Sequence, residues 1–375
     1  MKLTVDRDRL HAAMTRAGRV VERRNTTPIL SNVRIVAEGN RLLLTTTDLD
    51  IEAVSACPAV IATPGEITAP AHLIADIAGK LPKGAQVVLD LSDTTLAINS
   101  GRSRFKLQTL PATDFPQLSA GTFDWQFSLH AKTLLRLLGR TAFAISSEET
   151  RFYLNGIYLH APQVDGAPVL TAVATDGHRL ARQRCAVPAF TAGTAETFHG
   201  GIVPTKAINE ILRLVKDQDG DIELAFNGRL LRVTLPDETV LTTKLIDGTF
   251  PDYARVIPAG NTNVATLDRQ ALAEAVERVT TVSTEKTRAV KFDFRKGELT
   301  VSVQTQDGGA GEDTLDAAYE AADLTVGFNG AYTRSILDAL TSKTCAAAFA
   351  TAAEPSLWSD PDDADFLAVL MPMRV

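Results

Sequence analysis

Three residues with chemically active side chains lie within four positions of one another: Asp176, His178 and Arg179. A carboxylate two positions from an imidazole is the kind of pair that performs general acid–base catalysis when the two groups polarise each other. The surrounding segment has a short β-rich run from Leu170, then Asp-Gly, a dipeptide that favours tight turns, and then a second run. The pattern predicts a β-hairpin with this polar cluster at its turn.

The rest of the sequence gives little support to a catalytic interpretation of the cluster. It indicates no nucleophile, and it contains no Gly-rich phosphate loop and neither a His-x-x-x-His nor a Cys-x-x-Cys motif. The other histidines occur singly: His11, His72, His130, His160 and His199. We therefore rank an Asp/His hydrolase far below the other hypotheses, and we expect no catalytic residue, no metal and no cofactor.

The composition is that of an ordinary globular protein. A chain of 375 residues with 45% hydrophobic and 22% charged residues is long enough for two or three domains with normal cores. Cys57, Cys185 and Cys345 are far apart, which favours buried, unreactive thiols in a reducing compartment. The N-terminus lacks an apolar signal core, and no run reaches the length of a membrane span. We expect a soluble cytoplasmic protein that makes no membrane contact.

One order of elements recurs three times along the chain. First helices are predicted to begin at Thr4 (with Thr4 or Asp6 as the N-cap), Ser128 and Thr266, and second helices at Pro70, Pro204 and near Asn329. Strands lie between them, and Thr47-Asp48 ends a strand as Thr175-Asp176 does. A period this long predicts three copies of one α+β domain rather than a solenoid. We place the domains at residues 1–122, 123–256 and 257–375.

Basic residues recur on the predicted helices. Lys132, Arg136 and Arg140 are spaced i, i+4 and i+8, which places one basic stripe opposite a leucine-rich face. Acidic residues concentrate elsewhere, for example at Asp217 to Asp221 and Asp360 to Asp365. Such stripes are either the solvated faces of amphipathic helices or the lining of a basic hole inside an acidic shell. The second interpretation reconciles a net charge of −7 with nucleic-acid binding.

Several segments together resemble one known family, the bacterial DNA polymerase III beta subunit, which is the replicative sliding clamp. They span all three repeats: Ser100 to Phe105, Arg151 to Gly156, Thr175 to Ala181, Phe250 to Tyr253 and Met371 to Arg374. The resemblance implies an α+β fold with three copies of a clamp-type domain, each with two helices packed on antiparallel sheets. Two chains are expected to join head to tail, so that their six domains form a ring around duplex DNA.

The resemblance also implies roles for particular residues. Phe105 is expected at the dimer interface, opposite Thr281 and Val282. Phosphate contacts without sequence preference are expected from the basic helix residues and, by resemblance, from Arg24, Arg151 and Tyr153. The complete expected DNA-binding set is Arg24, Lys80, Lys132, Arg136, Arg140, Arg151, Tyr153, Lys206 and Arg213.

By resemblance, the hairpin turn and the chain's final segment form an apolar groove for short partner peptides between the second and third domains. The expected lining is Leu154, Thr175, Gly177, His178, Arg179, Leu180, Pro251, Arg255, Val256, Asn329, Tyr332, Val369, Leu370, Met371, Pro372, Met373 and Arg374. Adaptable methionines suit a surface that accepts several partners. Taken without the resemblance, Met371 and Met373 favour core packing of a final strand instead.

The leading hypothesis is a processivity clamp without catalytic activity of its own. Its expected partners are duplex DNA, a second copy of the chain, the replicative polymerase catalytic subunit, the clamp loader, and other DNA polymerases and repair proteins. Tethering by short peptide motifs works through effective concentration. The alternative is a clamp paralogue whose groove sequesters a small molecule or drug, as in self-resistance. Thr281 and Thr287, where the family often carries larger or aromatic residues, favour keeping that alternative.

Overall fold

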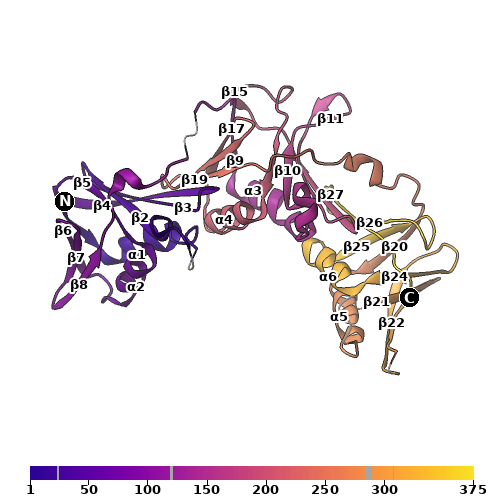
Figure 1. Cartoon of the computed structure of the whole chain (residues 1–375). Helices are drawn as coiled ribbons and strands as arrows, with labels where there is room; N and C mark the ends of the chain where they lie inside the picture. Colours follow the sequence, from indigo (N-terminus) through magenta and orange to yellow (C-terminus); the bar gives the residue numbers. More distant parts are fainter. Residues whose placement is uncertain (23–24, 119–120, 284–288, 307) are drawn as a thin grey trace. The chain divides into compact units, whose positions relative to one another are not determined.

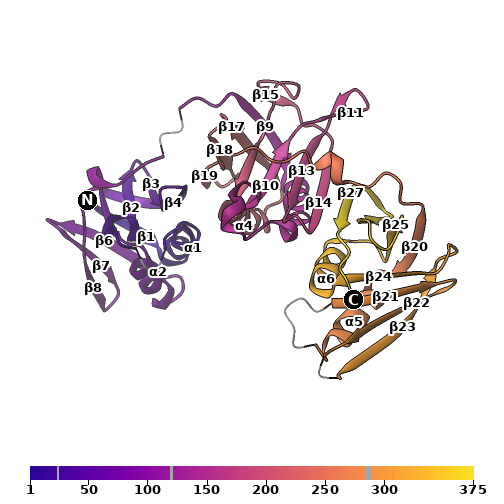
Figure 2. The same ribbon diagram turned by 45° about the vertical axis from the view of Figure 1, so that its right-hand side comes forward.

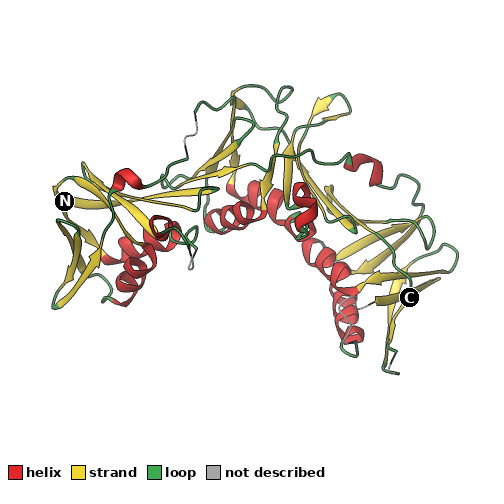
Figure 3. Ribbon diagram, in the orientation of Figure 1, coloured by secondary structure: helices red, strands yellow, loops and turns green. Residues whose placement is uncertain are grey.

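The computed structural model describes residues 1–22, 25–118, 121–283, 289–306 and 308–375. The chain divides into two compact units. Unit 1 comprises residues 1–131, 189–194 and 209–245, and unit 2 comprises residues 132–188, 195–208 and 246–375. Each unit is built on one large antiparallel sheet, and its helices gather on one side of the strands (Figures 1 and 3).

Unit 1 contains the sheet order β15-β9-β17-β18-β19-β4-β1-β6-β7-β8, and β3, β2 and β5 extend it from β4. Helices α1 and α2 pack against each other, and α1 also packs on β4. The elements are β1 (Lys2–Asp6), α1 (Arg7–Ala17), β2 (Asn32–Glu38), β3 (Arg41–Thr47), β4 (Ile51–Thr63), β5 (Gly65–Pro70), α2 (Ala71–Lys80), β6 (Gln86–Ser92), β7 (Thr95–Ser100), β8 (Ser103–Gln108), β9 (Trp125–His130), β15 (Phe190–Ala192), β17 (Asp221–Phe226), β18 (Leu230–Thr234) and β19 (Val240–Lys244).

Unit 2 contains the sheet order β16-β10-β13-β14-β27-β26-β25-β20-β23-β22-β21-β24. Helices α3 and α4 each carry residues of both units. The elements are α3 (Ala131–Gly139), β10 (Gly156–His160), β11 (Gln163–Val164), β12 (Ala167–Pro168), β13 (Leu170–Thr175), β14 (Arg179–Cys185), β16 (Gly201–Pro204), α4 (Thr205–Val215), β20 (Asn263–Asp268), α5 (Arg269–Thr280), β21 (Ala289–Arg295), β22 (Glu298–Gln304), β23 (Ala310–Ala318), β24 (Leu324–Asn329), α6 (Gly330–Ala339), β25 (Thr344–Phe349), β26 (Ser356–Asp360) and β27 (Asp363–Leu370).

The element order confirms the threefold repeat. Each copy runs strand, helix, four strands, helix, three strands, and the second copy adds the short strands β11, β12 and β15. The second copy is shared between the units, because β9, β17, β18 and β19 join the sheet of unit 1 while β10, β13, β14 and β16 join that of unit 2. The fold is therefore α+β, with two helices and antiparallel sheets in every copy.

The first helix of each copy begins later than predicted. The preceding strand runs on through Thr4, Ser128 and Thr266, so α1, α3 and α5 begin at Arg7, Ala131 and Arg269. Thr and Ser resemble N-caps in the sequence, but alternating burial, as at Leu3 and Val5, keeps these segments in the sheet. The alternative N-cap Asp6 is confirmed, since its Oδ1 accepts the backbone N–H groups of Asp8 and Arg9 at 3.0 and 3.1 Å.

Successive copies are joined by one recurring strand pair. In unit 1 the last strand of the second copy, β19, pairs with β4 of the first, with Leu241 opposite Ala53. In unit 2 the last strand of the third copy, β27, pairs with β14 of the second, with Val369 opposite Leu180. We call these two antiparallel contacts the seams. A seam makes a continuous sheet from two copies, and it therefore fixes their relative register.

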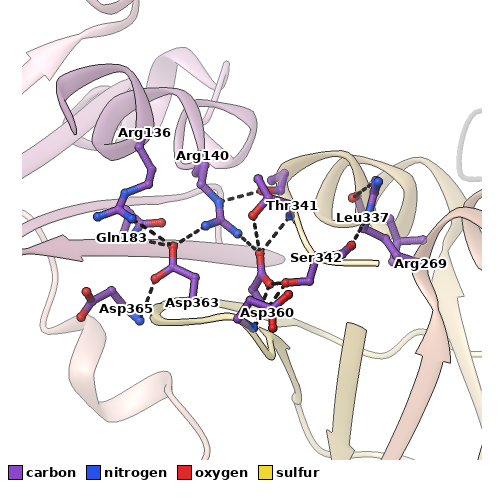
Figure 4. Close-up of polar contacts among 12 residues, drawn as sticks. Arg136, Arg140, Gln183, Arg269, Leu337, Thr341, Ser342, Asp360, Asp363 and Asp365 are labelled. Carbon is purple, nitrogen blue, oxygen red and sulfur yellow. Dashed lines mark hydrogen bonds and ion pairs between the residues drawn. The ribbon is translucent and has the colours of Figure 1, made fainter. Parts of the chain in front are cut away.

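A buried ion-pair network holds one end of the seam in unit 2 (Figure 4). Arg140, just after α3, donates to Asp360 at 2.6 Å, to Asp363 at 2.5 Å and to the Ala339 carbonyl at 2.7 Å. Its guanidinium also lies 4.1 Å from the centre of the Phe366 ring. Burial alone would raise the pKa of the Asp360 carboxyl, but hydrogen bonds from Ser342, Thr341 and Arg140 hold that pKa well below its usual range.

Replacing Asp360 by Asn should destabilise unit 2 in a pH-dependent way. Breaking a buried charge pair leaves Arg140 partly uncompensated, so we expect the free energy of unfolding to fall by about 3 kcal/mol at neutral pH. Because the pKa of Asp360 is lowered by folding, its contribution is full above the unfolded value of about 3.9 and is lost as the pH falls further. The difference between the two proteins should therefore narrow in acid.

Urea unfolding followed by the fluorescence of buried Trp358, in a Trp125→Phe background, reports on unit 2 alone. Asp362→Asn is the matched control, because Asp362 is an exposed carboxylate in the same hairpin. An equal loss of unfolding free energy in both variants would contradict a stabilising role for the buried Arg140–Asp360 pair. A loss in Asp360→Asn that does not change with pH would contradict it as well.

Candidate functional site

The polar cluster lies at the hairpin turn between β13 and β14, as the sequence predicts. The Thr175 hydroxyl donates to the Arg179 carbonyl at 2.7 Å and accepts from the Gly177 N–H at 3.1 Å. Asp176 Oδ1 accepts the N–H groups of His178 and Arg179, both at 2.9 Å. Gly177 has a φ of 88°, in the left-handed region that favours glycine. The turn is thus held by its own side chains.

The first copy builds the same turn between β3 and β4. Thr47 donates to the Ile51 carbonyl at 2.9 Å and accepts from the Leu49 N–H at 3.0 Å. Asp48 Oδ1 accepts the N–H groups of Asp50 and Ile51 at 2.9 and 2.8 Å. Leu49 occupies the position of Gly177, with a φ of 80°. Since the bonding pattern recurs where no histidine follows, it belongs to the architecture of the repeat rather than to acid–base chemistry.

The other groups of the turn are committed to structural contacts. Asp176 Oδ2 accepts from Arg179 Nε at 3.0 Å, and Arg179 Nη1 donates to Ser335 Oγ at 2.6 Å. The guanidinium lies 4.2 Å from the centre of the Tyr332 ring, on which His178 also stacks at 6.3 Å. Arg179 therefore ties the turn to α6, and the Asp176 carboxylate is used for that tie.

An apolar groove of about 280 Å³ lies beside the turn. Its floor belongs to a buried cluster that includes Leu154, Leu180 and Val369, while Met371 and Val256 are 42% and 52% exposed at its edges. The lining residues are Arg151, Tyr153, Leu154, Thr175, Gly177, His178, Arg179, Leu180, Pro251, Asp252, Tyr253, Val256, Val369 and Met371. An apolar floor with a few polar groups at the rim is typical of a binding site.

The seam in unit 2 positions the two long walls of the groove. Leu180 in β14 is opposite Val369 in β27, so their side chains share one face of the sheet. The Met371 N–H donates to the His178 carbonyl at 2.9 Å, which holds the segment after β27 against the turn. The groove therefore depends on residues far apart in the sequence that meet only because the second and third copies share a sheet.

The wall formed by Tyr253 is neutral at physiological pH. The Tyr253 hydroxyl is 3.0 Å from His160 Nε2. Burial lowers the pKa of His160 to about 4, and the nearby charge of Arg184 adds to this effect. Burial likewise raises the pKa of Tyr253. This uncharged pair packs behind the groove, next to the stacked rings of Tyr158 and Phe250, whose centres are 5.2 Å apart.

Most of the predicted groove residues do line it. Arg255, Asn329, Tyr332, Leu370, Pro372, Met373 and Arg374 do not. Leu370 is fully buried in the core, because side chains alternate along β27 and Val369 takes the groove face. Asn329 caps α6, and Tyr332 lies under Arg179. Arg255 is 2.8 Å from Asp252 and points to solvent.

Four lining residues were absent from the predicted groove. Arg151 and Tyr153 were assigned to DNA, and Asp252 and Tyr253 were not selected although they lie between Pro251 and Arg255. Arg151, held by Glu148 at 2.8 Å, covers Gly177 so closely that a Cβ there would lie 2.7 Å from Arg151 Nη1. The positive φ favours glycine at 177, and a larger residue there would have to displace the Arg151 guanidinium.

The predicted DNA-binding residues have different surroundings. Lys80 on α2, Lys132 and Arg136 on α3, and Arg213 on α4 are exposed, whereas Lys206 is half-buried. The assignment of Arg140 to an open basic stripe is wrong, because α3 ends at Gly139 and Arg140 turns into the buried network with Asp360. Arg24 and Thr287 lie outside the described residues.

The cysteines and the predicted interface residues differ in burial. The three cysteines are buried and free, and burial raises the pKa of each thiol, for Cys345 to about 12. Phe105 on β8 and Val282 after α5 are 36% and 39% exposed.

No helix in the described part of the chain is long and apolar enough to cross a membrane. The described residues contain no cluster of His, Cys, Asp and Glu that could hold a metal ion.

Comparisons with known proteins agree across the whole chain. Residues 1–119, 128–252 and 254–374 match the N-terminal, central and C-terminal domains of the DNA polymerase III beta subunit. The beta sliding clamp of Caulobacter vibrioides is 42% identical over 377 residues, covering all of both chains. A Bartonella birtlesii sliding clamp bound to griselimycin has a TM-score of 0.96 at 43% identity, again with full coverage of both chains. A Caulobacter crescentus clamp, with polyethylene glycol at its putative beta-motif tethering region, has a TM-score of 0.95, also at 43% identity and full coverage.

Proposed function

The chain belongs to the DNA polymerase III beta subunit family and is a sliding clamp, and from this premise we propose that two protomers join head to tail and close into a ring around duplex DNA. In this role it acts without chemistry of its own, in the cytoplasm, by keeping a polymerase on its template. The domain boundaries at residues 1–122, 123–256 and 257–375 are part of the same proposal. The observation that carries it is the recurring seam.

Two strands are left over when the seams within the chain are counted. A seam joins the last strand of one copy to the fourth strand of the preceding copy, as β19 joins β4 and β27 joins β14. The remaining last strand is β8, which ends the sheet of unit 1 and, within the described part of the chain, pairs with β7 alone. The remaining fourth strand is β23, which pairs with β22 along its length and with β20 only at Ala317 and Ala318. A third seam pairs β8 of one protomer with β23 of the other, and it forms twice in the dimer, which closes the ring.

The existing seams also give the register of the third one. Ile51, which begins β4, is opposite Thr243, and Arg179, which begins β14, is opposite Leu370. Superposing the repeats by their strand pairing matches these positions to Gly309 and Leu107. Continuing the antiparallel pairing by two residues then places Phe105 of one protomer opposite Gly311 of the other protomer.

The chemistry of the two edges supports this register. Gly311 has no side chain, and a Cβ there would lie 3.3 Å from the Val279 carbonyl oxygen and 3.6 Å from Val282 Cγ2, so a Phe105 ring opposite Gly311 would lie beside Val282. Arg104 and Lys106 lie on β8 and Arg102 lies in the turn before it, whereas β23 carries Glu312, Asp313 and Asp316. A basic strand facing an acidic strand favours this partner and orientation over pairing between like edges.

A disulfide test can examine this register. In a protein with Phe105→Cys and Gly311→Cys, mild oxidation should give a covalent dimer on a denaturing gel, because directly opposite residues meet disulfide geometry. The control combines Lys106→Cys with Gly311→Cys, which places the thiols on opposite faces of the sheet. The native cysteines are buried and should not interfere. Equal cross-linking in both proteins, or none in either, would refute the register.

We further propose that the exposed basic residues of the helices hold the duplex through its phosphates. Lys80, Lys132, Arg136 and Arg213 have the exposure and charge for this role, and Arg24, Lys206, Arg151 and Tyr153 are retained from the family resemblance. Contacts of this kind carry no sequence information and weaken as salt rises. They suit a ring that slides.

The groove beside Gly177 is proposed as the docking site for short peptide segments of the replicative polymerase catalytic subunit, the clamp loader, and other polymerases and repair proteins. Its apolar floor and its methionine at the edge support adaptable binding of apolar side chains. The alternative, a groove that mainly sequesters a small molecule, is favoured by one observation. The similar Bartonella protein is bound to griselimycin.

Removing residues Met371 to Val375 separates polymerase binding from dimer formation. The truncated protein should lose binding of the replicative polymerase catalytic subunit by about 100-fold or more, because one groove wall is gone, while it stays dimeric. Surface plasmon resonance and solution mass measure the two properties, and Val60→Ala, an exposed apolar residue in unit 1, is the control. Unchanged polymerase binding would show that the groove is misplaced. An intact groove that binds griselimycin but no polymerase subunit would support the alternative.

A further inference from the structure

The segment after β27, Met371 to Val375, is the third copy of a recurring feature that we call a strap. In each repeat the chain that leaves the last strand turns back and forms an isolated bridge with the strand before the second helix. The bridges join Leu110 to Thr68, Ile246 to Ile202 and Met373 to Gly327. The three bridged strand residues each lie two positions before Pro70, Pro204 or Asn329, so the straps are equivalent.

The third strap lies closer to its strand than a side chain would allow. At Thr68 the side chain fits beside the strap, and its hydroxyl donates to the Leu110 carbonyl at 3.0 Å. At Gly327 a Cβ would lie 2.4 Å from the Met373 carbonyl oxygen and 2.5 Å from Val375 Cγ1. The strap therefore occupies the place of a side chain, and only glycine permits that approach. Figure 2 shows the C-terminus beside β24.

The same strap carries one wall of the groove. The Met371 N–H donates to the His178 carbonyl and the Met373 N–H donates to the Gly327 carbonyl, both at 2.9 Å. Pro372 stands between them with a fixed φ, so the positions of Met371 and Met373 are mechanically linked. Moving the strap at Gly327 must therefore move Met371, which lines the groove.

We propose that Gly327 is a positioning residue for the groove: by admitting the strap against β24, it sets where the Met371 side chain meets a bound peptide. Gly327 itself does not line the groove. Its partner class is that of the groove, namely peptide segments that insert apolar side chains. This inference rests on the proposed docking function and adds a determinant outside the contact surface.

The test replaces Gly327 by Ala in the full-length protein. The added methyl displaces the strap, so affinity for the purified replicative polymerase catalytic subunit should fall about tenfold, while solution mass stays unchanged. Gly260→Ala is the matched control, because Gly260 is exposed and a Cβ there would meet nothing within 4 Å. Met373→Pro removes the Met373 N–H that donates to the Gly327 carbonyl. Because the substitution lies in the strap and not in a strand of the sheet, it tests the strap even if Gly327→Ala fails to fold.

A spectroscopic readout separates positioning from general destabilisation. The chain has four methionines, so ¹³C-methyl labelling gives few signals. The Met371 signal should shift in Gly327→Ala and in Met373→Pro, while that of Met14, buried in unit 1, should not. If both variants bind the polymerase subunit like Gly260→Ala, the inference is overturned. If the wild-type protein does not bind the subunit at all, the proposed docking function fails instead.

Discussion

The structure depends on one interaction, the antiparallel pairing of the last strand of one repeat with the fourth strand of the preceding repeat. Because this pairing recurs with the same register at Ile51 and Thr243 and at Arg179 and Leu370, it acts as a standard connector. It extends a sheet from copy to copy, and among the described residues it leaves one edge of β8 and most of one edge of β23 without a strand partner. A connector with two unlike free ends favours head-to-tail closure over back-to-back pairing. The proposed ring thus follows from how the repeats are joined.

The groove is a by-product of the same connector. Its two long walls come from β14 with the turn before it and from the segment after β27, and these meet only at the seam in unit 2. Two arginines support that seam: Arg140 binds Asp360 and Asp363, and Arg179 binds Asp176 and Ser335 while lying over Tyr332. The first set of charges is buried and the second is partly buried, and their hydrogen-bonded pairing helps to hold the groove in one geometry. A preformed site loses little ordering entropy when a peptide binds.

Local patterns predicted most of the fold and the position of the hairpin turn, whereas the groove residues were predicted from the family resemblance. The Asp-Gly hairpin, the second helices and the threefold order follow from turn residues, caps and periodicity, and the family assignment is confirmed. The errors arose where tertiary structure decides. Ser128 resembles a cap but lies in β9, and Arg140 fits a helical stripe but follows the end of α3. Leu370 is in the correct segment but on the buried face. Sequence alone also gave no sign that Gly327 supports a strap, since that contact joins β24 to the chain's last residues.

The most direct test of the account is topological. The dimer, loaded by the clamp loader of the same organism with ATP onto nicked circular duplex, should remain with the DNA during gel filtration in high salt. Cutting the circle once with a restriction enzyme should release it, because a ring slides off an open end while its electrostatic contacts are screened. Equal loss of the protein from circular and linear DNA, or its retention on both, would contradict an encircling clamp.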